Sequence, residues 1–366
     1  MKAITRLLVA TPLYPPEPGG PATYARLIER EFPLRGVEVD VVKFSDVRHA
    51  PKVVRHCAYF FRVLAQGRTV DALYALDPVS VGFPTALAAL LLRKPFYVKV
   101  VGDYAWEQGR QRFGVTADLD TFVKTTSVPC AVRGLRWVQR FVAHRAKKVV
   151  VPSAYLKSIV STWGVRSDII EVVFNAVEPH ERGVCPEAVA AVEGLIVVYI
   201  GRLVPWKHVD QTMDAVHSVQ TSGVALSLVV VGTGPLEEEL KKKAHDEQLS
   251  VLFVGALSPE DTQAVLEKAD ILVLNSSYEG LSHVLIEGLM HGKAIVATDA
   301  GGNGELIEDT KSGLLVPVGD PGALSEAIRA VCIREELRTA IERGAHERSR
   351  AFTVASMVSG TLQVLS

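Results

Sequence analysis

Short apolar runs rich in Val, Ile and Leu alternate with longer amphipathic stretches along the whole chain. Repeated strand–helix units of this kind predict parallel sheets with helices on both faces. The stretches 264–269 and 323–331 are examples with helical spacing. We therefore expect an α/β protein of two doubly wound, Rossmann-like domains. The predicted strands are residues 4–12, 38–44, 71–76, 95–102, 147–153 and 169–175, then 195–203, 226–234, 251–257, 269–277, 294–299 and 313–318.

The join between the two domains is expected in residues 178–194, an acidic stretch with two prolines between the strand-rich halves. This predicts an N-terminal domain over 1–178 and a C-terminal domain over 179–352. A last helical stretch, 353–366, follows the final strand and is expected to pack back on the first domain.

Composition fits an ordinary globular protein, with 48% apolar and 22% charged residues in 366. The longest apolar stretch, from Val79 to Leu92, is shorter than the roughly 20 residues that a bilayer crossing needs. Arg6 interrupts the first apolar run, so we expect no signal peptide. The four cysteines are far apart, which is typical of reduced thiols. A cytoplasmic protein is expected, at or near the inner face of the cell membrane.

Charge is unevenly distributed. Residues 1–178 carry 25 Lys and Arg against 15 Asp and Glu, a net charge of +10, while the remainder carries 15 against 26, a net charge of −11. The basic half is suited to an anionic partner, and attraction between the two domains is the alternative.

Ligands of open α/β sheets bind beyond the carboxyl ends of the strands, so residues directly after strands are the informative ones. After the first strand come Gly19 and Gly20, with Pro21 in the first turn of a helix. A glycine turn at a helix start suits a phosphate or an oxyanion. The alternative is a simple tight turn.

Two further segments follow strands of the second half. Arg202 and Lys207 lie five apart and suit a diphosphate, unless they are solvated surface cations. Gly232 and Gly234 lack the third glycine of the dinucleotide fingerprint. They indicate either a turn beside a nucleotide or a plain strand-to-helix turn.

The segment YEGLSHVLIEG, residues 278–288, follows the apolar run ADILVLNSS. Ser282 is a candidate N-cap for a helix that ends near His291. Glu279 then precedes this helix and Glu287 lies in its second turn. The amides of the first turn can hold an anion, and the carboxylate at each end can accept hydrogen bonds from hydroxyl groups. A nucleotide-sugar has these parts: a diphosphate between ribose hydroxyls and sugar hydroxyls. The alternatives are that Glu279 is an ordinary acid of a loop and that Glu287 is a solvated residue of the helix. His283, Glu287 and His291 share one face, but they lack the HExxH order of a zinc site.

Together these segments resemble the large retaining glycosyltransferase family 4 of GT-B architecture, in a bacterial branch. The signature is two glutamates separated by seven residues, met by Glu279 and Glu287. The resemblance covers nearly the whole chain in the family's order, through GGPATY, GRLVPWK, VGTGPLEEEL, VLFVGAL, ADILVLNSSYEGLSHVLIEG and GGNGELIEDTKSGLLV, and also GDYAWE, VVVPSAYLKSIVSTWGV and VFNAVE.

The resemblance implies a role for each matching residue. Arg202 and Lys207 would neutralise the donor diphosphate, Glu287 would bind the ribose hydroxyls, and Glu279 would face the donor sugar. Asp103 stands where many relatives carry a histidine near the reacting sugar, a different residue type. The remaining donor contacts are expected from the backbone: Gly280, Leu281 and Ser282 for sugar and phosphates, Val254 and Gly255 for the base, Gly232 beside the nucleotide, and Gly19 and Gly20 from the opposite domain.

The implied reaction moves a sugar from a nucleotide-sugar to an acceptor hydroxyl and keeps the anomeric configuration. The acceptor hydroxyl would attack from the face that the diphosphate leaves, and neither a metal nor a cofactor is expected. The literal DxD of Asp118–Leu119–Asp120 follows no hydrophobic strand and is interpreted as an acceptor-side loop. Three alternatives are a nucleotide-sugar epimerase of the same fold, a non-catalytic two-lobed binding protein, and an NAD-dependent oxidoreductase.

The acceptor class is less defined than the donor class. Residues 133–151 carry six basic side chains, with Trp137 and Phe141 among them. A basic amphipathic helix can rest on anionic lipid, or it can pack its aromatic side inward. The first arrangement motivates a cell-envelope glycan, a lipid-linked glycan or a glycolipid as acceptor, with a small molecule as the alternative. Contact with an anionic membrane is then expected, and no nucleic acid partner.

Overall fold

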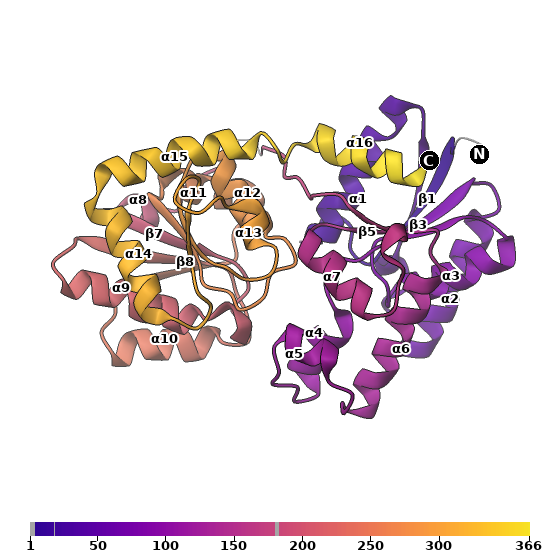
Figure 1. Cartoon of the computed structure of the whole chain (residues 1–366), viewed down its shortest axis with the longest axis horizontal. Helices are drawn as coiled ribbons and strands as arrows, with labels where there is room; N and C mark the ends of the chain where they lie inside the picture. Colours follow the sequence, from indigo (N-terminus) through magenta and orange to yellow (C-terminus); the bar gives the residue numbers. More distant parts are fainter. Residues whose placement is uncertain (1–3, 18, 180–182) are drawn as a thin grey trace. The chain divides into compact units, whose positions relative to one another are not determined.

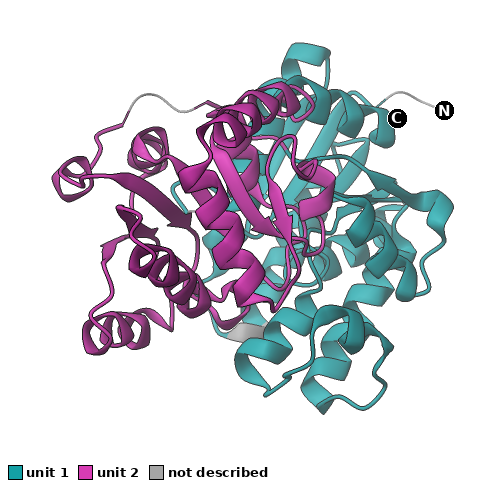
Figure 2. Cartoon of the chain, turned by 60° about the vertical axis from the view of Figure 1, so that its left-hand side comes forward, with its two compact units in different colours: residues 1–175, 354–366 teal, residues 176–353 magenta. Residues whose placement is uncertain are grey.

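The computed structural model describes residues 4–17, 19–179 and 183–366, which form two compact units (Figure 2). Unit 1 comprises Met1–Asn175 and Val354–Ser366, and unit 2 comprises Ala176–Thr353. The sequence places this division after residue 178. Residues 180–182 of the expected join lie outside the described residues. The join beyond them packs on unit 2, because the Val184 amide donates to Asp261 Oδ1 at 2.8 Å.

Unit 1 is built on a six-stranded parallel sheet in the order β2-β1-β3-β4-β5-β6. Its strands are β1 (Arg6–Thr11), β2 (Glu38–Lys43), β3 (Ala72–Ala75), β4 (Phe96–Lys99), β5 (Lys148–Val151) and β6 (Ile170–Val172). Its helices are α1 (Gly20–Glu31), α2 (Lys52–Gln66), α3 (Gly82–Leu92), α4 (Tyr104–Arg112), α5 (Leu119–Lys124), α6 (Cys130–Arg145), α7 (Ala154–Thr162) and α16 (Val354–Leu365), with 3₁₀ turns η1 (Pro33–Arg35), η2 (Phe44–Val47) and η3 (Ser167–Ile169).

Unit 2 has a second six-stranded parallel sheet, in the order β12-β11-β10-β7-β8-β9. Its strands are β7 (Leu195–Ile200), β8 (Leu226–Val231), β9 (Val251–Gly255), β10 (Ile271–Leu274), β11 (Ala294–Thr298) and β12 (Leu314–Val316). Its helices are α8 (Glu187–Ala190), α9 (Val209–Thr221), α10 (Glu237–Asp246), α11 (Pro259–Lys268), α12 (His283–Met290), α13 (Asn303–Leu306), α14 (Pro321–Ile333) and α15 (Glu335–Ser349), with the 3₁₀ turn η4 (Pro205–Lys207).

The α/β fold with two parallel sheets is confirmed, and a strand lies within each predicted strand segment. Helices cover both faces of each sheet (Figure 1). Strands β3, β4, β10 and β11 are buried along their whole length, as expected when a parallel sheet is enclosed by helices. Their apolar side chains on both faces therefore form the core of each unit. No helix in the described part of the chain combines the length and apolar character that a bilayer crossing requires.

The last helix, α16, packs on unit 1. The Thr361 hydroxyl lies 2.9 Å from the Tyr24 hydroxyl of α1, and the Tyr97 hydroxyl of β4 donates to the Leu365 carbonyl at 2.8 Å. These contacts join the end of the chain to two elements of the first half.

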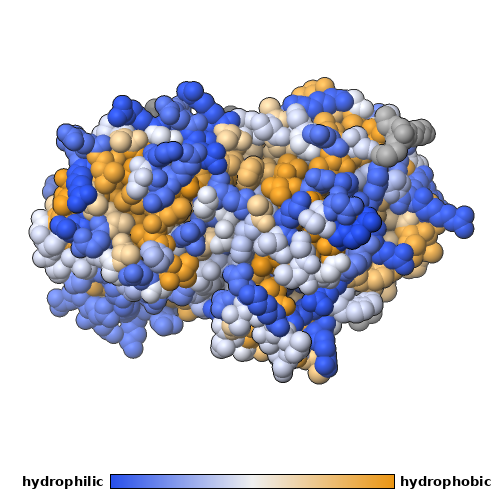
Figure 3. All heavy atoms as spheres, in the orientation of Figure 1, coloured by the Kyte–Doolittle hydropathy of each residue, from blue (hydrophilic) through white to orange (hydrophobic). Residues whose placement is uncertain are grey.

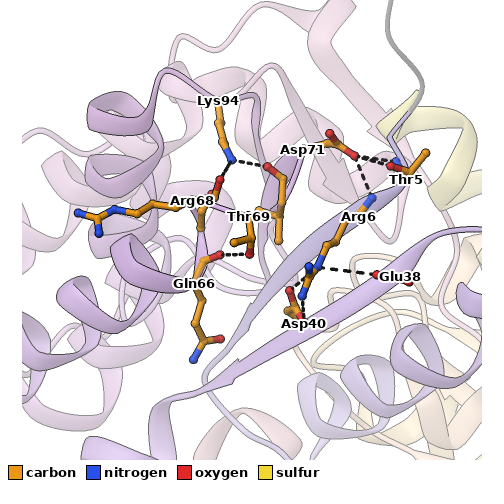
Figure 4. Close-up of polar contacts among 11 residues, drawn as sticks. Thr5, Arg6, Glu38, Asp40, Gln66, Arg68, Thr69, Asp71 and Lys94 are labelled. Atoms are coloured by element: carbon orange, nitrogen blue, oxygen red, sulfur yellow. Dashed lines mark hydrogen bonds and ion pairs between the residues drawn. The ribbon is translucent and has the colours of Figure 1, made fainter.

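The amino ends of the unit 1 strands are closed by polar contacts (Figure 4). Asp71 Oδ2 accepts hydrogen bonds from the amides of Thr5 and Arg6, at 2.9 and 3.0 Å. The Arg6 side chain pairs with Asp40 at 2.9 Å, and the Lys94 ammonium donates to backbone carbonyls of the 67–70 turn. At this edge the polar groups are therefore occupied by contacts within the protein. Ligands of such sheets bind at the opposite edge, beyond the carboxyl ends of the strands.

Each sheet has one point where the strand order reverses. In unit 2 the chain passes from β7 to β8 on one side and reaches β10 on the other, which is the Rossmann order. In unit 1 the reversal lies between β1 and β3, as in flavodoxin-like sheets. Ligands of doubly wound sheets bind at this point because the loops after the two central strands diverge there.

Lys99 is an ionisable residue in the core of unit 1. It is 2% exposed, and its Nζ has no hydrogen-bond partner among the described residues. The ammonium nitrogen lies 3.9 Å from the centroid of the Tyr24 ring, beneath α1. Burial lowers the pKa of Lys99 from 10.5 to about 7, because the charged form loses its hydration.

Replacing Lys99 with methionine should change how stability depends on pH. Between pH 7 and 9 the unfolded lysine keeps its proton while the folded one has lost it, so the free energy of unfolding of the wild type should rise. The expected rise is about 2 kcal/mol. Lys99→Met should lack it, and urea unfolding at both pH values measures the difference. The exposed Lys124→Met variant is the control and should keep the rise. An unchanged rise in Lys99→Met would contradict the assignment.

Candidate functional site

The loops that follow β7 and β10 begin side by side at the reversal point of the unit 2 sheet, because these strands are neighbours. The ammonium of Lys207, at the end of η4, forms an ion pair with Glu279 Oε1. The Ser276 hydroxyl donates to the same carboxylate oxygen at 2.7 Å. The side chains of Lys207 and Glu279 are only 16% and 12% exposed. A predicted cation and a predicted acid are thus held together at the edge where ligands bind.

Backbone contacts fix these two loops to each other. The Ser277 amide donates to the Trp206 carbonyl at 2.8 Å, and the Asn275 side chain donates to the His208 carbonyl at 3.3 Å. From the loop after β11, the Gly302 amide donates to the Glu279 carbonyl at 3.0 Å. Glu279 is therefore fixed through both its backbone and its carboxylate before any ligand arrives.

Arg202 lies directly after β7 and is exposed. Its carbonyl accepts a hydrogen bond from the Tyr199 hydroxyl at 3.0 Å. Burial, and to a lesser degree the nearby Glu279 carboxylate, raise the pKa of Tyr199, so this hydroxyl remains a donor. Within the described residues the Arg202 guanidinium has neither an ion pair nor a hydrogen bond. It is a cation with a fixed backbone and a side chain available to an anion.

The glycines after β8 are explained by close backbone contact with the Arg202 loop. A Cβ on Gly232 would lie 2.0 Å from the Gly201 carbonyl oxygen, and one on Gly234 would lie 2.3 Å from the Leu203 carbonyl oxygen. Gly232 also has a φ of +128°, which favours glycine. The strand-to-helix turn therefore accounts for both residues, and this turn supports the loop that carries Arg202.

The end of β9 adjoins the same turn. The Gly232 amide donates to the Gly255 carbonyl at 2.7 Å, so the residues expected near the base, Val254 and Gly255, lie beside the glycine turn. Both are half-buried. A Cβ on Gly255 would meet no atom within 4 Å, which leaves open space at this end of the strand.

The helix predicted after Glu279 is confirmed as α12. The Ser282 hydroxyl accepts from the Leu285 amide at 3.4 Å and caps it, and Gly292 follows its end with a φ of +58°. Gly280, Leu281 and Ser282 are all buried between Glu279 and this cap. Leu285, Ile286 and Leu289 bury the opposite side of the helix and hold it against the sheet.

Glu287 lies in the second turn of α12 and is half-buried. Its carboxyl has no hydrogen bond or ion pair to any residue in the described ranges. Burial raises its pKa from 4.5 to about 7, because nothing there compensates the lost hydration of the carboxylate. A desolvated carboxyl without a partner, on the helix that follows β10, is suited to accept hydrogen bonds from hydroxyl groups of a ligand.

Two of the residues considered as metal ligands, His291 and Asp118, have other contacts. His291 Nε2 contacts the Gln263 side chain, and Asp118 caps α5 by accepting from the Thr121 amide at 2.8 Å. In the described residues no three His, Cys, Asp or Glu side chains are grouped to hold an ion. The N-cap accounts for Asp118, the first acid of the DxD sequence.

The glycine turn of unit 1 has the predicted local structure. Gly19 has a φ of +135° and precedes α1, which begins at Gly20 with Pro21 in its first turn. Its carbonyl accepts from the Ala22 amide at 3.0 Å, and an ion pair between Glu17 and Arg48 anchors the preceding loop. This turn follows β1, at the reversal point of the unit 1 sheet.

Asp103 has a structural role. It is 1% exposed and caps α4, with Oδ1 accepting from the Trp106 amide at 2.9 Å and Oδ2 from the Trp163 indole at 3.2 Å. Burial raises its pKa, and these donors oppose the rise. The contacts account for an acid here, while its expected place near the reacting sugar stays a prediction.

Sequence comparison identifies the family of the chain. The model of the "Glycosyl transferase 4-like domain" matches residues 7–176, and that of "Glycosyl transferases group 1" matches residues 187–348. The chain belongs to glycosyltransferase family 4. Its two matched regions coincide with the two units, and the second contains the loops after β7, β8, β9 and β10.

Individual relatives of this family member are distant. It is 25% identical over 378 residues to the D-inositol 3-phosphate glycosyltransferase of Saccharomonospora viridis, with 92% of this chain and 86% of the relative covered. It is 27% identical over 213 residues to the Campylobacter jejuni enzyme N-acetylgalactosamine-N,N'-diacetylbacillosaminyl-diphospho-undecaprenol 4-alpha-N-acetylgalactosaminyltransferase, with 57% of each covered. The chain spans about half the length, 46% and 57%, of the first two curated relatives that it matches.

Solved structures show the same fold. The Anabaena protein HepE in complex with UDP and glucose matches with a TM-score of 0.78 at 18% identity, over 99% of both chains. The two-domain GT-B fold expected from the sequence is confirmed by this match, together with the two parallel sheets.

The contact between the glycine turn and the Arg202 loop can be tested by substitution. Gly232→Ala should destabilise unit 2 by about 2–4 kcal/mol, since it combines an overpacked contact with positive-φ strain. Gly255→Ala is the matched control, because its φ of +73° gives strain without a clash. Its expected cost is about 1–2 kcal/mol. Urea unfolding midpoints compare the two, and equal losses would show that the contact is unimportant.

Proposed function

We propose that this protein transfers a sugar from a nucleotide-sugar to an acceptor hydroxyl with retention of the anomeric configuration. The observation that carries the proposal is the arrangement at the reversal point of unit 2. An unpaired Arg202, a fixed Lys207–Glu279 pair and an unpartnered Glu287 follow the central strands there, in a chain of the glycosyltransferase family. HepE, which shares the fold, has been solved with UDP-glucose, and this supports the donor class.

The departing diphosphate is the main electrostatic demand of the reaction. The Arg202 fork can bind two diphosphate oxygens, while Lys207 supplies a compact positive charge. Both act as preorganised groups, because their backbones are held by Tyr199 and by the loop after β10. Protein cations then perform the neutralisation for which other enzymes use a metal ion, so we propose a metal-independent reaction.

The two glutamates suit the hydroxylated parts of the donor. Glu287 would accept hydrogen bonds from the ribose, which would give its desolvated carboxyl the partners that it lacks. Glu279 would face the sugar, oriented by Ser276 and by its own ion pair with Lys207. Positioning of this kind lowers the barrier only when it is complete before the reaction begins.

The chemical step is a substitution at the anomeric carbon. The bond from this carbon to the diphosphate oxygen breaks, and a bond to the acceptor oxygen forms on the same face. The acceptor proton passes to an oxygen of the departing diphosphate, so no protein nucleophile or base is needed. From unit 1, Gly19 and Gly20 would approach the donor diphosphate, and Asp103 would lie near the reacting sugar.

We propose a lipid-linked glycan or glycolipid of the cell envelope as the acceptor, met at the cytoplasmic face of the membrane. The C. jejuni relative is named for an undecaprenol-diphosphate-linked glycan, and another for a phosphatidylinositol monomannoside. Both names denote polyisoprenoid-linked or lipid acceptors. They support the same acceptor class for this chain, which is a distant relative of both enzymes.

A donor screen that detects released nucleoside diphosphate tests the function. Arg202→Ala should lower kcat about 10²–10³-fold, the usual effect of losing one preorganised charge donor. Glu287→Ala should raise the donor KM, because it removes the ribose contact. Arg343→Ala, an exposed arginine on α15, is the control and should match the wild type.

Two results of that screen would overturn the proposal. Full activity in both Arg202→Ala and Glu287→Ala would place the reaction elsewhere. Conversion of the donor to its epimer without any acceptor would identify an epimerase instead.

The pKa of Glu287 predicts how donor binding depends on pH. Its carboxyl loses a proton near pH 7 in the free protein. If the ribose binds the carboxylate, donor affinity should rise about tenfold from pH 6 to pH 8. Glu287→Gln should bind more weakly and show a flat profile over this range. Calorimetric titration with the donor found in the screen measures both, and parallel profiles would contradict the role of Glu287.

A further inference from the structure

Three neighbouring helices of unit 1 contain no acidic residue. The sequences of α2, α3 and α6 include neither Asp nor Glu, while α6 alone carries four arginines. Helices α2 and α3 pack together, and α3 packs on α6. Their rings meet there, with Phe83 of α3 lying 6.4 Å from Trp137 and 5.8 Å from Phe141 of α6. We call this layer the acid-free face.

Apolar side chains are exposed on each helix of the acid-free face. Five of the eleven large apolar side chains that are exposed in the described residues belong to it: Val54, Phe61, Leu90, Leu91 and Trp137, at 54, 64, 52, 66 and 59%. In Figure 3 hydrophobic spheres gather near the right-hand margin, where Figure 1 places α2 and α3. Exposed apolar groups concentrated on one face indicate an interaction surface.

Helix α6 packs only part of its aromatic side inward: Phe141 is half-buried against Phe83 of α3, whereas Trp137 is exposed. Its buried face is formed by Val132, Gln139, Val142 and Ala143. Trp137 instead stacks on Phe141 at the surface, with ring centroids 5.4 Å apart. An exposed tryptophan with arginines on the same helix is typical of a membrane interface.

The cations of this face lie near its exposed apolar groups. Arg133 is exposed one turn before Trp137, and Arg145 is exposed near the end of α6. Arg93 follows Leu90 and Leu91 at the end of α3 and is also exposed. Arg62 of α2 is paired with Asp46 of η2 at 2.7 Å, so it contributes little net charge.

We propose that the acid-free face docks on an anionic lipid bilayer, with Phe61, Leu90, Leu91 and Trp137 entering the interface and Arg93, Arg133 and Arg145 facing lipid headgroups. Charge decides between this partner and a second copy of the chain. A two-fold dimer would place the same face against itself, and its arginines would then repel. A bilayer supplies both the apolar layer and the negative charge. The inference extends the proposed lipid-linked acceptor, because it would bring unit 1 to the surface where such acceptors lie.

Vesicle sedimentation of the full chain tests the proposal without requiring catalysis. Vesicles of phosphatidylcholine alone are compared with vesicles that also contain phosphatidylglycerol, at low and high salt. The wild type should sediment with the anionic vesicles and be released by salt. Each arginine removed, in Arg133→Gln and Arg145→Gln, should lower binding about fivefold. A Phe61→Ser, Leu91→Gln, Trp137→Gln variant should lose most of the remaining binding.

Matched controls separate this face from general hydrophobicity and charge. Leu34→Gln and Ile333→Gln remove apolar side chains that are 76% and 51% exposed elsewhere, and Arg343→Gln removes an exposed arginine of unit 2. These variants should bind like the wild type. Equal sedimentation of the triple variant and the wild type would overturn the proposal. So would a wild type that sediments no more with anionic vesicles than with phosphatidylcholine vesicles. The proposal would also be overturned if the wild type formed a dimer without vesicles and the triple variant did not. A second copy of the chain would then be the occupant of the face.

The same variants distinguish this inference from the proposed function. Nucleoside diphosphate release with a water-soluble acceptor should be unchanged in the triple variant. If the wild type transfers sugar but does not bind vesicles, the docking proposal alone is wrong. Vesicle binding without transfer to any acceptor would remove the proposed function alone.

Discussion

The site depends on one ion pair at a topological reversal. Where β7 and β10 run side by side, their loops leave in different directions and expose the carboxyl edge of the sheet. The Lys207–Glu279 pair joins these loops, and Ser276 together with the backbone contacts of Trp206 and His208 makes the join rigid. A flexible lysine alone would lose conformational entropy on meeting a diphosphate. Glu279 already orders it, so less of that cost remains when the ligand binds.

Burial perturbs two ionisable groups in opposite directions, and only one of them suggests a ligand site. It raises the pKa of Glu287 and lowers that of Lys99, each to about 7. Glu287 is half-buried at the carboxyl edge, where a ligand can supply hydroxyl donors. Lys99 lies in the core, with the Tyr24 ring over its ammonium. A perturbed pKa therefore identifies a functional candidate only when the position also admits a ligand.

The strands, the cap at Ser282 and the turn at Gly19 could be predicted because each follows from local sequence. Apolar runs between helical stretches identify strands, and a serine before an apolar helical segment identifies its start. The explanation for Gly232 could not be predicted, since it depends on the Gly201 carbonyl from a neighbouring loop. The cap at Asp103 also had a local signal, because an Asp directly before a helix is a common N-cap, while the role near the reacting sugar that the family pattern implies stays a prediction. The exposure of Trp137 depends on which face of α6 meets α3 and α4, and periodicity does not select that face.

Overall charge alone would favour the first half of the chain for an anionic donor, whereas the proposed donor cations lie in the second half. The second half of the sequence, which holds Arg202 and Lys207, has a net charge of −11, whereas the first half is basic. At physiological ionic strength, however, charges separated by more than about 8 Å in water are largely screened. A diphosphate at the sheet edge therefore responds to the cations beside it more than to the acidic remainder of the unit. The basic excess of the first half would act on a different length scale, because a membrane surface at the proposed face would meet several arginines at once. Local geometry is thus the argument for the proposed donor site, while the distribution of charge over a whole face is the argument for the proposed membrane-docking surface.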